Sequence, residues 1–178
     1  MINLRQVQES PKVKAFLKQA DDNLMAIGYK EHGFRHANLA ADIARNVLTH
    51  LGYSERESEL GGIAGYLHDI GNTIGRSEHA QSGAVLSLHI LTEMGMALEG
   101  VSQIVRAIGG HGEKEVDPDT TITAAVILGD KTDVHSTRVR SLPGKPRLVS
   151  TFTTHDRVNY ACQRAFLNVY IGGHKTKG

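Results

Sequence analysis

Ten histidines in a chain of 178 residues are the feature of this sequence that points most directly to chemistry. Imidazole nitrogens and carboxylate oxygens together suit iron, manganese, zinc, cobalt or nickel. No single helix can surround a cation, so a site needs donors from several elements whose ends meet. Six donors fall where we expect helix ends: His36, His68, Asp69, His79, His111 and Asp130. The pattern predicts a site for one or two divalent transition-metal ions.

The adjacent pair His68 and Asp69 is the centre of this prediction. In a helix of about 3.6 residues per turn, neighbouring side chains point about 100° apart. The turn-forming residues at 70–75 place the pair at a helix end, where both side chains could serve one site. The two oxygens of Asp69 could also bridge two cations about 3.5–4 Å apart, a geometry that activates water.

Other histidines leave alternatives open. His79 could be an exposed residue at a helix start and His111 a residue of a glycine turn, and His89 or His135 could replace either of them. We expect His32, His50 and His174 on the surface. His155-Asp156 repeats the letters of the central pair, but no aspartate follows it, so we interpret Asp156 as a helix-start residue that favours the helix dipole. Cys162 is expected to be a small buried apolar residue.

Several basic residues are candidates for binding phosphate, because the arginine fork matches phosphate geometry. Their competing interpretation is a solvated basic surface, and the sequence does not decide between the two. The candidates are Lys131, Arg138, Arg140, Arg35 and Arg76.

Helical periodicity covers most of the chain and predicts an all-α, bundle-like fold. Ser10 and Pro11 mark a helix start, and Ser54 and Glu57 have the spacing of a capping box. The predicted helices are 10–28, 36–52, 54–67, 77–95, 101–108 and 117–130, with helix resuming near 156 after a loop at 136–150. No repeat or composition break divides residues 1–178, so one domain is expected.

Composition excludes several classes of protein. The net charge is +1, so nothing indicates a nucleic-acid or membrane-surface protein, although nucleic acid stays possible as a partner. The single cysteine excludes an internal disulfide framework and fits a reducing cytoplasm. No segment approaches the ~18 apolar residues of a membrane span, and residues 1–18 lack the apolar core of a signal peptide. A homo-oligomer remains open.

The order His36, His68-Asp69, Asp130 resembles the HD superfamily of metal-dependent phosphohydrolases. The surrounding residues strengthen the likeness, which spans about 32–135: 33–36 (GFRH), 66–71 (YLHDIG) and 128–131 (LGDK) all look like that family's motif contexts. The resemblance implies a helical HD-type domain in which His36, His68, Asp69 and Asp130 bind one metal. His79 and His111 resemble the extra histidines of members that hold a second metal, with Asp69 as the bridge.

The resemblance also implies a function. We expect hydrolysis of a phosphomonoester or phosphodiester, in a small phosphorylated substrate such as a nucleotide, with Asp69 and His68 central to catalysis. One alternative is an HD-type di-iron oxygenase. The other is a regulatory module that binds a nucleotide without turnover.

Overall fold

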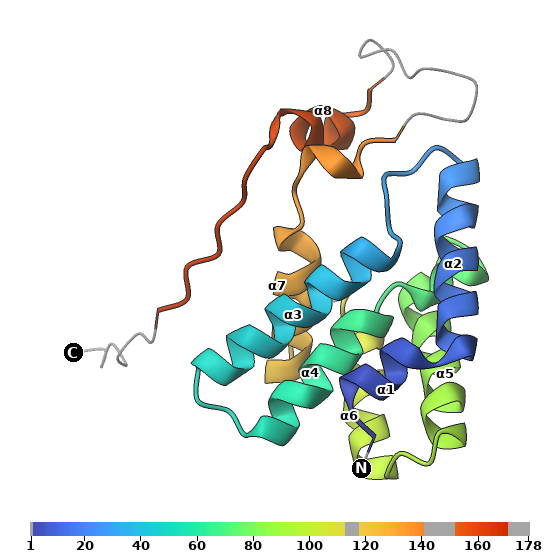
Figure 1. The fold of residues 1–178 in the computed structure, drawn as a ribbon, viewed down its shortest axis with the longest axis vertical. Helices are drawn as coiled ribbons and strands as arrows, with labels where there is room; N and C mark the ends of the chain where they lie inside the picture. Colours follow the sequence, from blue (N-terminus) through green and yellow to red (C-terminus); the bar gives the residue numbers. More distant parts are fainter. Residues whose placement is uncertain (1, 113–117, 141–151, 171–178) are drawn as a thin grey trace.

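Helices are the only regular secondary structure that the computed structural model contains in its described residues, 2–112, 118–140 and 152–170. The α-helices are α1 (Leu4–Glu9), α2 (Pro11–Ala26), α3 (Phe34–His50), α4 (Glu55–Leu67), α5 (His79–Glu93), α6 (Leu98–Gly109), α7 (Thr121–Thr132) and α8 (Thr154–Ala161). Two 3-10 helices, η1 (Ile70–Thr73) and η2 (Ser136–Arg138), lie between them. The predicted all-α fold is confirmed (Figure 1). None of these helices is both long and apolar enough to cross a lipid bilayer.

The local signals at several helix ends act as the sequence predicts. The Ser10 side chain accepts a hydrogen bond from the backbone of Val13 at the start of α2. Ser54 and Glu57 form the predicted capping box of α4. Gly52, just after α3, has a φ of 82°, a left-handed conformation that glycine adopts without strain.

Several helix starts differ from the prediction, among them that of α6, which begins at Leu98 rather than at 101. Helix α1 was not predicted, and it begins with a capping box in which Asn3 pairs with Gln6. Helix α5 begins at His79 rather than Ser77, after Glu78 in a left-handed conformation with no side-chain cap. Helix α7 begins at Thr121 rather than near 117, because the Thr120 side chain caps it. Of the predicted loop at 136–150, residues 136–138 form η2 and residues 141–150 lie outside the described part.

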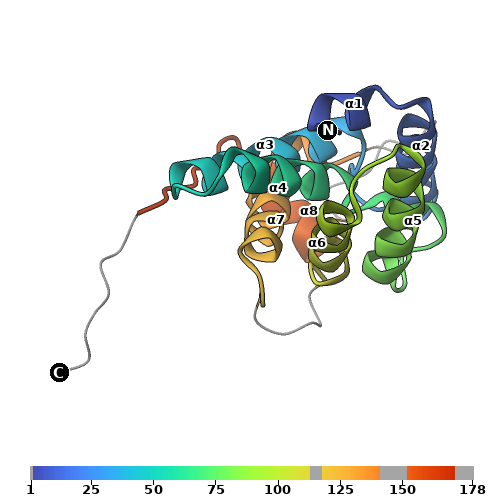
Figure 2. The same ribbon diagram turned by 90° about the horizontal axis from the view of Figure 1, so that it is seen from below.

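Helix α3 packs against both α4 and α7, and small residues allow all three to approach closely. A Cβ added to Gly65 on α4 would lie 2.8 Å from the carbonyl oxygen of Ala40 on α3, and one added to Gly129 on α7 would lie 2.6 Å from the same atom. Figure 2 shows α3 and α4 above α7 and α6. Because His36, His68 and Asp130 lie within four residues of these contacts, the close packing determines how near their side chains come.

The remaining elements bring further histidines to the same region. Helix α5 packs against α6 and against η1, which follows directly after Asp69. Residue 71 in η1 is a glycine, and any side chain there would overlap the carbonyl oxygen of His79. The glycine therefore allows the start of α5 to lie against η1. The core beneath is formed by buried apolar side chains from α1 to α7, among them Leu17, Leu48, Leu60, Ile63, Leu67, Leu91, Ile104, Ile108 and Val126.

Candidate metal centre

Six predicted donor residues converge from five places in the fold. His36 lies in the first turn of α3, His68 and Asp69 follow the last residue of α4, and His79 begins α5. His111 lies just after α6, and Asp130 is in the last turn of α7. The structure therefore brings together residues that are as far as 94 positions apart in the chain (130 − 36).

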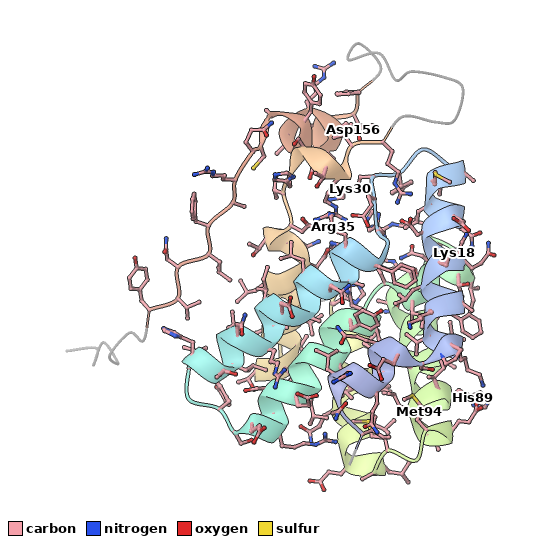
Figure 3. All side chains as sticks on the ribbon, viewed as in Figure 1. Lys18, Lys30, Arg35, His89, Met94 and Asp156 are labelled. Atoms are coloured by element: carbon pink, nitrogen blue, oxygen red, sulfur yellow. The ribbon has the colours of Figure 1, made fainter. Side chains whose placement is uncertain are left out.

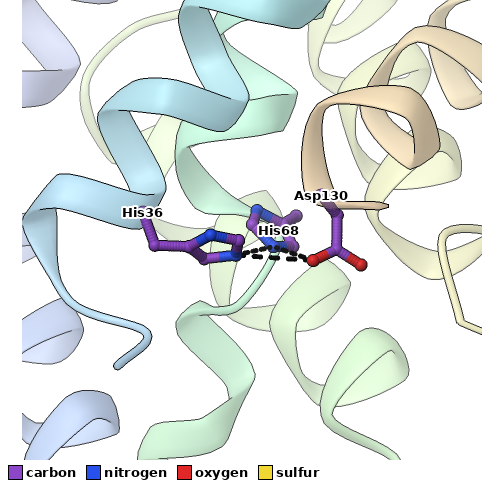
Figure 4. Close-up of side chains that lie close together, drawn as sticks. All are labelled: His36, His68 and Asp130. Atoms are coloured by element: carbon purple, nitrogen blue, oxygen red, sulfur yellow. Dashed lines mark hydrogen bonds and ion pairs between the residues drawn. The ribbon is translucent and has the colours of Figure 1, made fainter. Parts of the chain in front are cut away.

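The closest group is formed by His36, His68 and Asp130, whose side chains point toward one another in Figure 4. The Nε2 atoms of the two histidines are 3.2 Å apart. Oδ1 of Asp130 lies 3.4 Å from Nε2 of His36 and 3.8 Å from Nε2 of His68. Donor atoms this close, with both nitrogens facing one point, suit ligands that share one cation.

The carboxylate of Asp69 faces two sets of donors. Its Oδ2 lies 3.3 Å from Nε2 of His68 and 3.5 Å from Nε2 of His36. Its Oδ1 lies 3.5 Å from Nε2 of His79 and accepts a hydrogen bond of 2.9 Å from Asn72. His111 joins His68 and Asp69 in a second group of donors that lie within 4.8 Å of one another. Asp69 is thus placed between two overlapping groups, as a bridging ligand would be.

The histidine rings are held by their Nδ1 atoms. His68, His79 and His111 each place Nδ1 against the backbone oxygen three residues earlier, at 2.7, 3.1 and 2.5 Å. An acceptor at Nδ1 places the proton there and leaves the lone pair of Nε2 available for a cation. The three rings therefore present the nitrogen that a metal needs.

His36 is held differently, by a carboxylate that the sequence analysis missed. Nδ1 of His36 donates to Oδ2 of Asp133 over 2.7 Å, and the Asp133 side chain is 1% exposed. Arg35 donates to both oxygens of Asp133, over 3.1 and 2.8 Å. Burial raises the pKa of Asp133, but these hydrogen bonds outweigh burial and lower it below its usual value. A carboxylate behind a ligating imidazole orients the ring and increases its basicity.

The electrostatics of the cluster favour a cation. Burial lowers the pKa of His111 to about 4 and also lowers that of His79, so both rings are neutral at pH 7. Burial lowers the pKa of His36 too, but hydrogen bonds to Asp130, Asp133 and Asp69 raise it to about 10. Without a metal, a proton on His36 offsets one of the three carboxylate charges. The donor set of neutral imidazoles and ionised carboxylates fits a first-row transition metal, which would replace that proton.

Two of the predicted phosphate-binding residues are structural. The Arg138 side chain is completely buried, and its guanidinium donates to the backbone oxygens of Glu31 and Asp133. It therefore cannot reach a substrate, and its prediction was wrong. Arg140 forms an ion pair with Asp21 and extends to the backbone oxygen of Lys30, and it is not part of the pocket lining.

The other basic candidates lie nearer to the donors. Arg35 is partly exposed, but its nitrogens bond Asp133 and Glu31, so its observed role is to hold Asp133. Arg76 lies 3.8 Å from Oδ1 of Asp69 and stacks over the ring of Tyr29. Lys131 lies 3.3 Å from Oδ2 of Asp130.

A pocket of about 540 Å³ opens onto the donor cluster. Its described lining includes Asp69, His79, His111 and Asp130 together with the cationic residues Lys30, Arg76 and Lys131. Thr153, His155 and Asp156, at the start of α8, form part of the wall. The pocket therefore joins the donors to a cavity whose wall carries both cationic and anionic side chains, and its volume is of a size that accommodates small molecules.

Some predictions for the remaining histidines need correction. His32 is buried, at 5% exposed, and lines the pocket instead of lying on the surface. It precedes the start of α3, so no helical spacing links it to His36 and no local signal in the sequence could have found it. His155 also lines the pocket, although Asp156 forms the predicted helix-start contact by capping with Thr153.

The alternatives for the donor set fall outside the site. His89 and His50 are exposed, and His135 bonds to Thr137 and to the backbone of Gln163. His174 lies outside the described residues. Cys162 is half-buried rather than buried.

Comparison with known proteins finds a relative whose own function is not characterized. The chain is 31% identical to the uncharacterized protein MJ1020 of Methanocaldococcus jannaschii over 157 residues, which cover 74% of this chain and 59% of the relative. The chain thus spans less than two thirds of the curated relative that it matches. No protein-family model and no solved structure matches it.

Proposed function

We propose that this chain is a metal-dependent phosphohydrolase of the HD type that acts on a small phosphate ester. The observation that carries the proposal is the position of Asp69, whose two oxygens face different histidines in a pocket that three cationic side chains also line. A simple structural carboxylate would need only one such partner. The order of the motif residues in the sequence, which resembles the HD superfamily, supports the same conclusion.

The residues divide between two cation positions. His36, His68, Asp69 and Asp130 would hold the first cation, while Asp69, His79 and His111 would hold the second. Divalent cations bound there supply Lewis acidity, which neutralises charge on a phosphoryl oxygen and lowers the pKa of water.

The residues of the chain perform the remaining tasks. Asp133 keeps the proton of His36 on Nδ1 and so directs Nε2 toward the centre. Asn72 donates to Oδ1 of Asp69 and fixes the orientation of that carboxylate. Arg76 and Lys131, each beside one of the central carboxylates, supply positive charge on the side of the pocket that an anionic substrate would enter.

The direct test is phosphate release before and after removal of metal. We expect the purified protein to hydrolyse p-nitrophenyl phosphate or at least one member of a nucleotide panel. A chelator should abolish this activity, and manganese, iron or another first-row metal should restore it. The same assay with Asp69→Asn, whose carboxamide cannot replace a bridging carboxylate, should show no activity at any metal concentration. Metal-loaded protein that releases no phosphate from any ester would contradict the proposal.

A di-iron oxygenase is the second candidate, because Asp69 between two groups of histidines also suits a pair of iron ions. It predicts that iron alone restores activity and that activity is lost without oxygen. Phosphate release that persists under anaerobic conditions and with manganese would exclude this candidate.

A further inference from the structure

Lys30 is a cation in the pocket without a carboxylate partner of its own. It lies between the end of α2 and the start of α3, on the side of the site that faces α8 (Figure 3). Its side chain lines the pocket and is partly buried, and its ammonium forms no ion pair with the described residues. A partly buried ammonium without a counter-ion is unfavourable unless an anion binds to it.

The other pocket cations already have carboxylates beside them. Lys131 lies against Oδ2 of Asp130, and Arg76 lies near Oδ1 of Asp69. Each of those two cations therefore balances one of the central carboxylates. Lys30 lies on the same pocket wall, where Arg138 and Lys131 repel its charge and Asp130 and Asp133 attract it. None of these residues forms an ion pair with Lys30, so its ammonium stays available to an anion in the pocket.

The hydrogen bonds that residue 30 forms within the described part of the protein involve its backbone and not its side chain. Its carbonyl oxygen accepts from Nδ1 of His32 over 2.7 Å and from Nη2 of Arg140 over 3.4 Å. Neither bond involves the side chain. A variant at residue 30 should therefore keep both backbone hydrogen bonds. Because the ammonium has no structural role of its own among the described residues, we look to a bound ligand for its function.

We propose that Lys30 binds the additional negative charge of a terminal phosphoryl group, so that the pocket selects phosphomonoesters over phosphodiesters. This inference rests on the proposed function and narrows its substrate class. A terminal phosphomonoester carries nearly two negative charges above its second pKa of about 6, whereas a diester carries one. A cation beyond those that balance Asp69 and Asp130 favours the more highly charged ester, since a charge-assisted contact gains most with a dianion.

The matched variants are Lys30→Gln, Lys30→Arg and Lys18→Gln. Lys18 is an exposed residue on α2 that pairs with Asp22 and is not part of the pocket lining (Figure 3). Each protein, loaded with the same metal, would be assayed at pH 8 with p-nitrophenyl phosphate and bis(p-nitrophenyl) phosphate. Binding of inorganic phosphate, measured by calorimetry, supplies a readout that is independent of turnover.

We expect Lys30→Gln to lower kcat/KM for the monoester by about 10- to 100-fold, the size of one charged hydrogen bond, and to weaken phosphate binding to a similar extent. The kcat/KM for the diester should change much less, so Lys30→Gln should lose the preference for the monoester. Lys30→Arg should retain most of that preference. Lys18→Gln should match the wild type.

Two results would overturn the inference while the proposed function stands: equal behaviour of Lys30→Gln and Lys18→Gln, or a wild-type protein that cleaves the diester at least as well. If metal-loaded wild type cleaves neither ester nor any nucleotide, the proposed function fails and the inference fails with it.

Discussion

Nδ1 of His36 and Oδ2 of Asp133 are 2.7 Å apart in a part of the protein that water does not reach, and 97 residues of chain separate them. Asp133 also binds Arg35 and lies 3.4 Å from Nε of Arg138. The ring that faces the centre is therefore held from behind by a carboxylate that two arginines hold in turn. This arrangement makes Asp133 a positioning residue for the candidate metal centre.

Replacing Asp133 with asparagine should weaken metal binding without removing a donor. Outer partners of metal-ligating histidines typically change metal affinity by about 10- to 100-fold, and we expect a loss in this range. Metal titration followed by calorimetry measures it. Asp42→Asn, at an exposed position of the same helix as His36, is the control and should leave the affinity unchanged. An affinity for Asp133→Asn equal to that of the control would show that Asp133 does not support the site.

Metal binding should release about one proton from His36. The pKa of His36 is raised from its ordinary value of 6.5 to about 10, so protonation of His36 stabilises the metal-free protein. This stabilisation is complete below pH 6.5 and is lost as the pH rises through about 10. A metal must displace that proton across this window, so its apparent affinity should rise by about tenfold per pH unit. His79 and His111, whose pKa values are lowered, are already neutral at pH 7 and should add none.

The number of protons released follows from calorimetry at pH 7 in buffers of different ionisation enthalpy. Metal binding that proceeds with the same affinity from pH 6 to pH 9 would contradict this account of His36.

Metal removal should destabilise the fold. Without a cation, Asp69, Asp130 and Asp133 keep their charges in a buried cluster with one proton on His36. A metal at 100 times its dissociation constant should add about 2.7 kcal/mol to the free energy of unfolding. Thermal unfolding of chelated protein, with manganese or zinc added back, should show a midpoint that rises with metal concentration. Magnesium, which prefers oxygen ligands, should have little effect. A midpoint that no transition metal changes would argue against the site.

The packing of α3 against α7 should depend on Gly129. A Cβ at this position would lie 2.6 Å from the carbonyl oxygen of Ala40, so Gly129→Ala must push the helices apart. Overpacking of this kind costs about 1–3 kcal/mol, and we also expect weaker metal binding because Asp130 moves. Urea unfolding measures the first effect. Gly109→Ala is the matched control, since its Cβ would meet only Ala84 at an ordinary 3.7 Å. Equal stability of the two variants would contradict the role given to Gly129.

The sequence was sufficient to predict that the candidate donor residues converge, because spacing and helix ends carry that information. His36, His68, Asp69 and Asp130 stand in recognisable local contexts, and helix ends that meet in a bundle bring them together. For His79 and His111 the sequence left surface positions and two other histidines as alternatives, and the structure places both beside Asp69. For the first four residues, local sequence was enough to indicate where the side chain would lie.

The surroundings of the donors could not be predicted in the same way. Asp133 and Arg138 follow Asp130 by three and eight positions and look like parts of a polar loop. Only the folded chain shows that they face the segment at 31–36, because pairing over about 100 residues leaves no local pattern. His32 was misplaced for the same reason: it stands in a polar sequence, but the packing of neighbouring segments buries it.

The central claim is that the donor cluster binds metal, and elemental analysis of the purified protein tests it most directly. The account predicts one or two equivalents of a first-row transition metal in the wild type and in His89→Ala, whose exposed position on α5 lies far from the site (Figure 3). His68→Ala and Asp69→Ala, checked for folding by circular dichroism, should have lost the metal. A folded wild-type protein that contains no metal and takes up none on reconstitution would contradict the account.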